Sequence, residues 1–173
     1  MFQQLTKAAV GFRRLAAFVI DWCILALYAG VLFLAVTPLV APLFQASPLM
    51  AELTGFGLLT LPMVLYFAIM EASSWRATIG KRVLHLSVGE GKSGRRIGFS
   101  SSLFRSAVKF LPWELAHFAV WNVFIFTNSP VSSIGVGALV ASYLLIAIYI
   151  VSLFIKNGRT PYDMAAGTAV RVK

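Results

Sequence analysis

Four long runs of apolar residues alternate with shorter polar segments along the chain. They cover residues 15–40, 55–70, 110–127 and 134–155, and the third run is the least apolar. A helix needs about 20 mostly apolar residues to cross the hydrocarbon core of a bilayer. The pattern therefore predicts an all-α membrane protein with about four transmembrane helices, organised as a single membrane domain over residues 1–173.

The ends of the first run carry two signals. Pro38, Pro42 and Pro48 lie at and beyond its end, and proline cannot continue a helix. We therefore expect the first helix to end near residue 40 and residues 41–54 to form a loop. The run also contains Asp21 and is longer than the roughly 7–15 apolar residues of a secretory signal peptide, so it is expected to remain in the protein.

The polar segment between the second and third runs, residues 71–109, contains its own pattern. Residues 83–88 form a short β-prone stretch with alternating apolar positions. A glycine-rich turn and a second short stretch over residues 95–99 follow, which suggests a small β-hairpin at the membrane surface. Residues 168–172 alternate in the same way and are expected to lie against this hairpin.

Charge adds an orientation to this picture. The chain has 15 Lys and Arg against 6 Asp and Glu, and apolar residues make up 59% of it. The cations precede the first run, fill residues 71–109 and follow the fourth run, whereas residues 41–54 carry only Glu52 and residues 128–133 carry no charge. By the positive-inside rule the basic side is cytoplasmic, so a four-span chain has both termini in the cytoplasm. A three-span chain would place the C-terminal cations outside.

The same distribution bears on partners. Besides the bilayer itself, the basic side is expected to attract anionic lipids of the inner leaflet. Binding to nucleic acid would require clustered cations together with accessible aromatic side chains on a soluble face. The topology accounts for the net charge of +9, so no nucleic-acid partner is expected.

Ionisable residues inside apolar runs are costly in a membrane and are the first candidates for function. Asp21 follows Arg14 by seven residues, which places both on one face of a helix. Asp21 should lie roughly 10 Å deeper than Arg14 at the helical rise of about 1.5 Å per residue. Arg105 and Lys109, one turn apart at the start of the third run, are the cations expected to neutralise it.

Glu114 and His117 form a second candidate pair, three residues apart in the third run. Pro112 just before them frees backbone carbonyls that need other partners. A histidine beside a carboxylate can relay protons, and a packed polar contact is the favoured alternative. Because these ionisable groups are all expected in the cytoplasmic half, one four-helix unit offers no ionisable path across the membrane, and conduction would require an oligomer.

No catalytic or metal-binding constellation emerges from the sequence. His85 and His117 are far apart, Cys23 is the single cysteine, and no acidic or histidine residues have the spacing of metal ligands. The serines lack an evident general base. We therefore expect no enzymatic activity, no metal and no cofactor.

Four segments, in order along nearly the whole chain, resemble motifs of the RDD family, small bacterial membrane proteins named for one arginine and two aspartates. The segments are Arg14-Leu-Ala-Ala-Phe-Val-Ile-Asp21, Thr78-Ile-Gly80-Lys81-Arg82, Phe99-Ser-Ser-Ser-Leu-Phe-Arg105 and the stretch from Gly158 to Thr168 that contains Asp163. The sequence departs from the family at Tyr162, where a histidine or a similar residue is common.

The resemblance implies that Arg14, Asp21 and Asp163 are the key residues and that the protein lies in a bacterial plasma (inner) membrane. Asp163 follows the fourth run on the cytoplasmic side, where Arg14, Lys81 and Arg105 are expected to converge on it. With Lys109, Glu114 and His117, the motif residues Thr78, Gly80, Lys81 and Arg105 form the expected supporting polar network.

Two functions follow as hypotheses. The leading one is transport of ions or small solutes by a homo-oligomer, because the family is suspected of transport and ionisable residues lie inside the membrane. The alternative is a membrane scaffold or assembly factor that transports nothing and uses its basic cytoplasmic face.

Overall fold

The computed structural model describes residues 7–125, 132–155 and 158–173. Most of the uncharged segment 128–133 therefore falls outside the described residues, as do Lys156 and Asn157 after the fourth apolar run. Three helical stretches are long and apolar enough to cross a membrane, namely Ala8–Ala46, Pro48–Ala72 and Ser133–Ser152. A fourth long helix runs beside them, so the all-α membrane fold expected from the sequence is confirmed.

The first apolar stretch is longer than expected. It consists of α1 (Lys7–Val31), the π-helical turn η1 (Leu32–Val36) and α2 (Thr37–Ala46). The expected helix end near residue 40 is wrong, because Pro38 lies in the first turn of α2, where a proline needs no N–H partner. The wide turn η1 precedes it, and the Thr37 hydroxyl donates to the Leu32 carbonyl at 3.3 Å.

The second stretch also exceeds its predicted bounds. It comprises α3 (Pro48–Gly55), η2 (Phe56–Thr60) and α4 (Leu61–Ala72), so most of the loop expected at residues 41–54 is helical. Ser47 alone separates α2 from α3: its backbone is extended, and its hydroxyl accepts from the Met50 amide at 3.2 Å. A serine N-cap followed by proline is a strong helix start. Pro48 therefore begins a helix instead of ending one.

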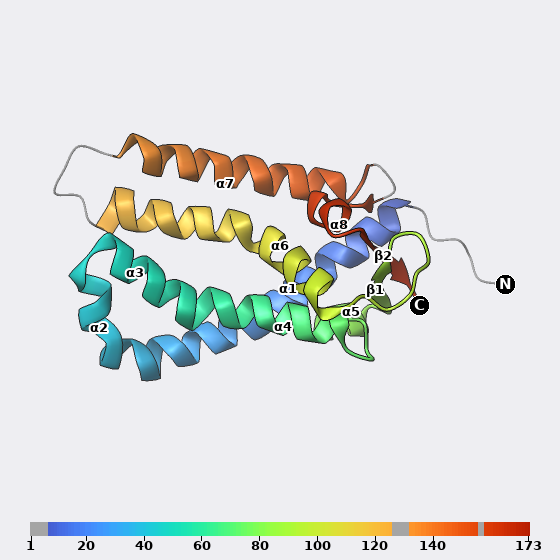
Figure 1. The fold of residues 1–173 in the computed structure, drawn as a ribbon, viewed down its shortest axis with the longest axis horizontal. Coiled ribbons are helices and arrows are strands. Elements are labelled where there is room, and N and C mark those ends of the chain that lie inside the picture. The colour runs from blue at the N-terminus through green and yellow to red at the C-terminus, as the bar shows by residue number, and fades with distance from the viewer. Residues whose placement is uncertain (1–6, 126–131, 156–157) are drawn as a thin grey trace.

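The remaining long helices are α6 (Phe99–Ala119), continued by η3 (Val120–Ile125), and α7 (Ser133–Ser152). They contain the third and fourth apolar runs. Figure 1 shows α4, α6 and α7 side by side, with α1 crossing them obliquely. The apolar core lies between α1, α4 and α6 and contains Leu25, Met63, Val64, Phe67 and Phe110.

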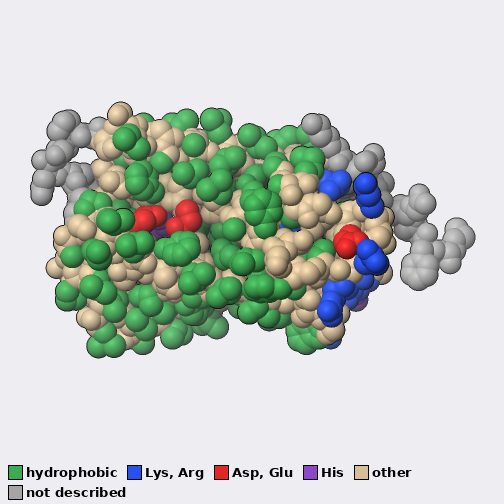
Figure 2. Space-filling model, viewed as in Figure 1, with side chains coloured by type: hydrophobic (Ala, Val, Ile, Leu, Met, Phe, Trp, Pro, Cys, Tyr) green, Lys and Arg blue, Asp and Glu red, His purple; other side chains and the backbone are tan. Residues whose placement is uncertain are grey.

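Short elements gather at one end of the helices. They are α5 (Ile79–Val83), β1 (Leu86–Glu90), α8 (Pro161–Ala165) and β2 (Thr168–Val172). The start of α1 and the C-terminus lie at this same end, and the Lys and Arg side chains in view gather there (Figures 1 and 2). We call it the basic end. The turn between α2 and α3 lies at the opposite end.

The expected β-hairpin is only half right. β1 pairs antiparallel with β2, with Val88 opposite Val170, which confirms the placement of residues 168–172. Residues 95–98 form no strand: of these residues Arg95 bonds to β1, its carbonyl accepting from the Glu90 amide at 2.9 Å, and Arg76 takes the position beside Val88. The Arg76 carbonyl accepts from the Val88 amide at 2.7 Å, and its Nε donates to the Val88 carbonyl at 3.2 Å.

The outer surface of the helices is apolar, and the charged groups lie inside. Leu34 is 78% exposed and Leu39 is equally open, whereas Arg105, at 1% exposure, is the largest fully buried side chain among the described residues. Water would not favour such a surface, but lipid tails would. The distribution of polarity therefore supports a bilayer as the surrounding medium.

Candidate functional site

Asp163 is the centre of a buried ion-pair cluster at the basic end. Arg14 donates to its Oδ2 at 2.6 Å, and Arg105 donates to its Oδ1 from Nε at 3.0 Å and from Nη2 at 2.9 Å. Three segments far apart in the chain, α1, α6 and α8, meet at this carboxylate. The expected convergence of Arg14 and Arg105 on Asp163 is therefore confirmed.

The local sequence of α8 holds the Asp163 carboxylate in place. Thr160 caps this helix, and Asp163 returns the bond as a capping box: Oδ2 accepts from the Thr160 amide at 3.1 Å and from its hydroxyl at 2.8 Å. Burial alone would raise the pKa of the Asp163 carboxyl, but Arg105, Arg14 and Thr160 together lower that pKa below its ordinary value. Asp163 is thus an ionised group fixed between two cations.

Glu71, at the end of α4, is a second anionic centre. It accepts from Lys81 Nζ and from Arg105 Nη1, so Arg105 joins the two carboxylates. The expectation that Lys81 pairs with Asp163 is wrong, since the short helix α5 carries Lys81 to α4 instead. Glu71 was absent from the predicted site residues. Its position could have indicated an ion pair, because Glu71 ends an apolar run and a segment rich in cations follows it.

Asp21 is held by neutral donors. Its carboxylate accepts from the Thr78 hydroxyl at 2.6 Å, from the Gly80 amide at 2.9 Å and from the Tyr66 hydroxyl at 3.1 Å. The expectation that Arg105 and Lys109 neutralise Asp21 is wrong: within the described residues neither lies within 4.0 Å of its oxygens. The Thr78 to Arg82 motif instead packs the start of α5 against α1.

Gly80 allows this close approach. A Cβ at residue 80 would collide with the carbonyl oxygen of Ala17 and press on the Asp21 carboxyl. Backbone atoms cannot move aside as a flexible side chain can, so α5 would have to leave α1. The small residue in the motif is therefore explained by packing.

Gly80→Ala is expected to destabilise the protein by about 1–3 kcal/mol, the usual cost of overpacking a close contact. Thermal unfolding in a nonionic detergent, followed by tryptophan fluorescence, measures this loss. Gly30→Ala is the matched control, since a Cβ at residue 30 of α1 meets no atom within 4 Å. Equal melting temperatures for the two variants would contradict the packing argument.

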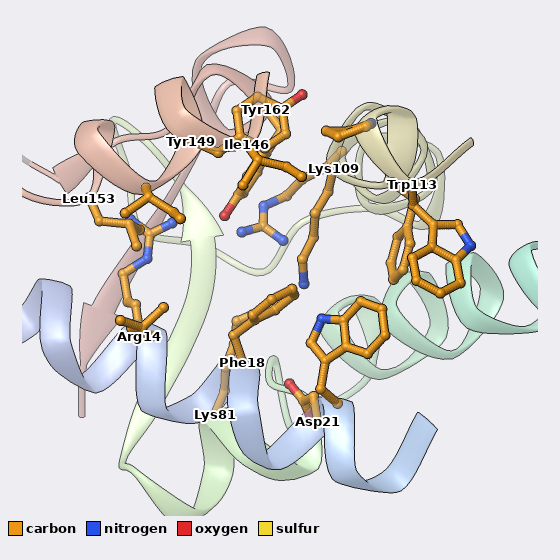
Figure 3. A pocket seen from close by; sticks show the side chains of 16 residues that line it. Arg14, Phe18, Asp21, Lys81, Lys109, Trp113, Ile146, Tyr149, Leu153 and Tyr162 are labelled. Carbon is orange, nitrogen blue, oxygen red and sulfur yellow. The ribbon is translucent and has the colours of Figure 1, made fainter. Parts of the chain in front are cut away.

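A cavity of about 260 Å³ lies beside the ion-pair cluster, between α1, α6 and α7. Figure 3 shows Phe18 on its α1 side, Lys109 and Trp113 on its α6 side and Tyr149 on its α7 side. Its charged lining residues are Arg14, Asp21, Lys81, Arg105 and Lys109. The remaining lining residues are apolar or aromatic, namely Leu15, Phe18, Trp22, Phe110, Pro112, Trp113, Ile146, Tyr149, Ile150, Leu153 and Tyr162.

Pro112 ties α6 to α7 along this cavity. A proline lacks the N–H that would bond the carbonyl four residues earlier, and the Tyr149 hydroxyl donates to this Val108 carbonyl at 2.8 Å. The Ser142 hydroxyl donates to the Pro112 carbonyl itself at 2.7 Å. The expectation that carbonyls freed near Pro112 find other partners is confirmed.

A second polar cluster surrounds Glu114, farther from the basic end. The Thr60 hydroxyl donates to Glu114, and the Trp113 indole donates to the Thr60 oxygen at 3.0 Å. Glu114 follows Arg105 by nine residues of α6, which corresponds to about 13 Å at the helical rise. Acidic side chains accordingly lie in the apolar body, well separated from the basic end (Figure 2).

The expected pairing of Glu114 with His117 is absent among the described residues, where no hydrogen bond or ion pair joins the two. The His117 ring instead packs edge-on against Trp113, with ring centroids 4.4 Å apart. His117 Nδ1 and Glu52 Oε2 are buried without a hydrogen-bond partner in the described part of the chain.

This arrangement divides the ionisable groups between two places along the helices. Thr60 binds Glu114, and Glu52, which was expected in a loop, lies in α3 because residues 48–55 are helical. Titratable groups therefore occur at two depths. Within residues 7–125, 132–155 and 158–173, no three His, Cys, Asp or Glu side chains lie close enough to hold a metal ion.

An apolar outer surface around buried ion pairs, carried by long helices, defines an all-α membrane protein. The sequence model of the RDD family matches residues 8–171, nearly the whole chain. The chain therefore belongs to the RDD family. Comparisons with curated proteins and with solved structures find no match.

Proposed function

We propose that this RDD family member transports ions or small solutes across a bacterial plasma (inner) membrane. The observation that supports this proposal is the presence of titratable groups at two depths within an apolar helical body. Trp113 connects the two depths, because it lines the cavity beside the ion-pair cluster and donates to Thr60 in the cluster around Glu114. Buried ionisable groups in a membrane are costly and commonly mark a solute or proton pathway.

The orientation belongs to the same proposal. The positive-inside rule assigns the basic end, where the start of α1 and the C-terminus lie, to the cytoplasm. Glu52, in α3 near the opposite end of the helices (Figure 1), would then lie in the outer half of the membrane. Solute would enter the cavity from the cytoplasmic leaflet and pass the level of Glu114.

The transporting unit is proposed to be a homo-oligomer. Among the cavity-lining residues, Trp22, Trp113 and Ile146 lie farthest from the basic end along their helices, so the cavity does not extend to Glu52. A second copy packed on the apolar outer surface would complete the path. No catalytic role is proposed for the carboxylates that bind a cation, a hydroxyl or an amide, which are Asp21, Glu71, Glu114 and Asp163.

The proposal is tested with purified protein in liposomes that contain pH- and cation-sensitive dyes. Wild type is expected to carry flux above protein-free vesicles, and Glu114→Gln is expected to abolish it, because the amide keeps the Thr60 contact but cannot titrate. Glu90→Gln is the control, since Glu90 lies at the surface of the basic end. Wild-type flux no greater than that of empty vesicles would overturn the proposal.

A scaffold or assembly factor is the second candidate, and the exposed cations of the basic end support it. Such a protein would bind an acidic partner through this end. Crosslinking in cells should then recover a partner at a fixed stoichiometry, and a chain with exposed cations of the basic end replaced by Gln should lose it. Recovery of self-contacts alone would contradict this role.

A further inference from the structure

The buried charges around the cavity do not balance. The buried cations Arg14, Lys81 and Arg105 match the three buried carboxylates in number, and Lys109, which is half-buried, adds a fourth cation. The three carboxylates are Asp21, Glu71 and Asp163. Four minus three leaves one positive charge when all are ionised. An unpaired ammonium in apolar surroundings is costly, and that cost is removed either by loss of the proton or by an anion from outside the chain.

The excess charge can be assigned to Lys109. Glu71 and Asp163 bind the other three cations within 4.0 Å, and Asp21 is satisfied by hydroxyl and amide donors. In the described part of the chain, Lys109 Nζ has no ion pair and no hydrogen bond. Its ammonium lies 3.3 Å from the centroid of the Phe67 ring, and the Phe18 and Phe110 rings are next, at 5.0 and 5.7 Å.

Lys109 presents this charge to the cavity. Figure 3 shows its side chain extended from α6 into the space beside Phe18. Arg14, Lys81 and Arg105 line the same cavity, so its charged end has a positive potential. A carboxylate or phosphate placed there would have all three N–H donors of Lys109 available to it.

The rest of the cavity suits an apolar chain. Trp22 and Trp113 line it, and Ile146 and Ile150 of α7, which also line it, are 41% and 44% exposed on the outer surface. The apolar part therefore continues onto the face that lipid tails would cover. The volume of about 260 Å³ is just below the range of about 300–1,000 Å³ usual for small-molecule pockets. It accommodates a head group and the first part of a chain.

We propose that this cavity is a binding site for one acidic amphiphile, with its anionic head at Lys109 and its apolar tail between α1 and α7. The ligand class is a monoanionic carboxylate or phosphate ester on a hydrocarbon chain, either a free fatty acid or a lipid of the bilayer. The head of such a ligand neutralises the excess charge, and its tail fills the apolar part of the cavity. This site does not depend on the transport proposed above, because occupancy alone is required.

The test measures quenching of tryptophan fluorescence by a dibrominated stearate, in nonionic detergent, since Trp22 and Trp113 line the cavity. Wild type is expected to show saturable quenching. Lys109→Met removes the charge at similar volume and is expected to weaken this binding by about tenfold or more, the scale of a lost charge-assisted bond. Lys92→Met, at an exposed loop position, is the control and should bind like wild type.

The melting temperature without ligand distinguishes a structural role of Lys109 from a role in ligand binding. Lys109→Met should melt at or above the wild-type temperature, because it removes an unpaired cation from an apolar site. The methyl ester of the brominated acid should bind at least about tenfold more weakly to wild type, as it lacks the charge. Equal quenching by acid and ester, or wild-type affinity in Lys109→Met, would overturn the proposal.

Competition identifies the source of the amphiphile. Displacement of the brominated acid by oleate but not by phosphatidylglycerol assigns a free fatty acid, and the reverse assigns a lipid of the bilayer. Displacement by inorganic phosphate at concentrations as low as those of the amphiphiles would overturn the proposal, because the site would then recognise a small anion without a tail.

Discussion

Asp163→Asn is expected to destabilise the protein by about 3–5 kcal/mol, the range found when one partner of a buried ion pair is removed. The carboxylate is fully buried and accepts from both Arg14 and Arg105. The amide would keep the shape but leave two guanidinium groups with less compensating charge. It would also place an NH2 group against donors at one of the two oxygen positions. Three segments, α1, α6 and α8, should therefore lose their common anchor.

Thermal unfolding in nonionic detergent, followed by tryptophan fluorescence, measures the loss. Glu90→Gln is the control, because the Glu90–Arg95 pair lies at the surface, where an ion pair contributes little. Its melting temperature should equal that of wild type. An Asp163→Asn protein as stable as the control would show that the cluster is not a structural anchor.

The same variant has a pH signature. The folded-state pKa of Asp163 is lowered, so its contribution is fully present above the unfolded pKa and is lost as the pH falls through the folded value. Wild type should accordingly lose stability on acidification over a range that begins near the ordinary aspartate pKa of about 3.9. Asp163→Asn lacks this group, so its melting temperature should fall less steeply over that range.

The apolar runs predicted the helices, because a helix in contact with lipid needs a long apolar segment. Such a segment can be recognised from consecutive residues alone. The bounds were less predictable. Ser47 with Pro48 begins α3, because the N–H that proline lacks has no partner in the first turn of a helix, and α2 continues through Pro42 without that residue's N–H bond. The same ambiguity led to the expectation that Glu52 lies in a loop, whereas it lies in α3.

The candidate site was likewise predictable in part from the sequence. The resemblance to the RDD family supplied Arg14, Asp21 and Asp163, and the structure brings Arg14 to Asp163 across 149 residues. The partner of Asp21 was not predictable from charge. A carboxylate can be satisfied by hydroxyl and amide donors as well as by cations, and only the docking of α5 on α1 decides between them. Glu71 was not predictable from the family resemblance, because it lies at the end of an apolar run and outside the four motif-like segments.

Glu71→Gln is expected to lower the free energy of unfolding by a similar amount, about 3–5 kcal/mol. A second substitution can test which unpaired charge causes the loss. Glu71 is fully buried and pairs with Lys81 and Arg105. Arg105 keeps Asp163 as a partner in the variant, whereas Lys81 loses its only ion-pair partner within the described residues. Lys81 is therefore the main uncompensated charge.

Adding Lys81→Met to Glu71→Gln should recover part of the lost stability, because the double variant no longer buries an unpaired ammonium. Melting temperatures of wild type, both single variants and the double variant close a double-mutant cycle. Glu114→Gln serves as the control for loss of an intramembrane carboxylate, since a neutral amide can still accept from Thr60. If the cluster acts through charge balance, the double variant melts above Glu71→Gln; if it melts below, shape rather than charge holds α4 to α5.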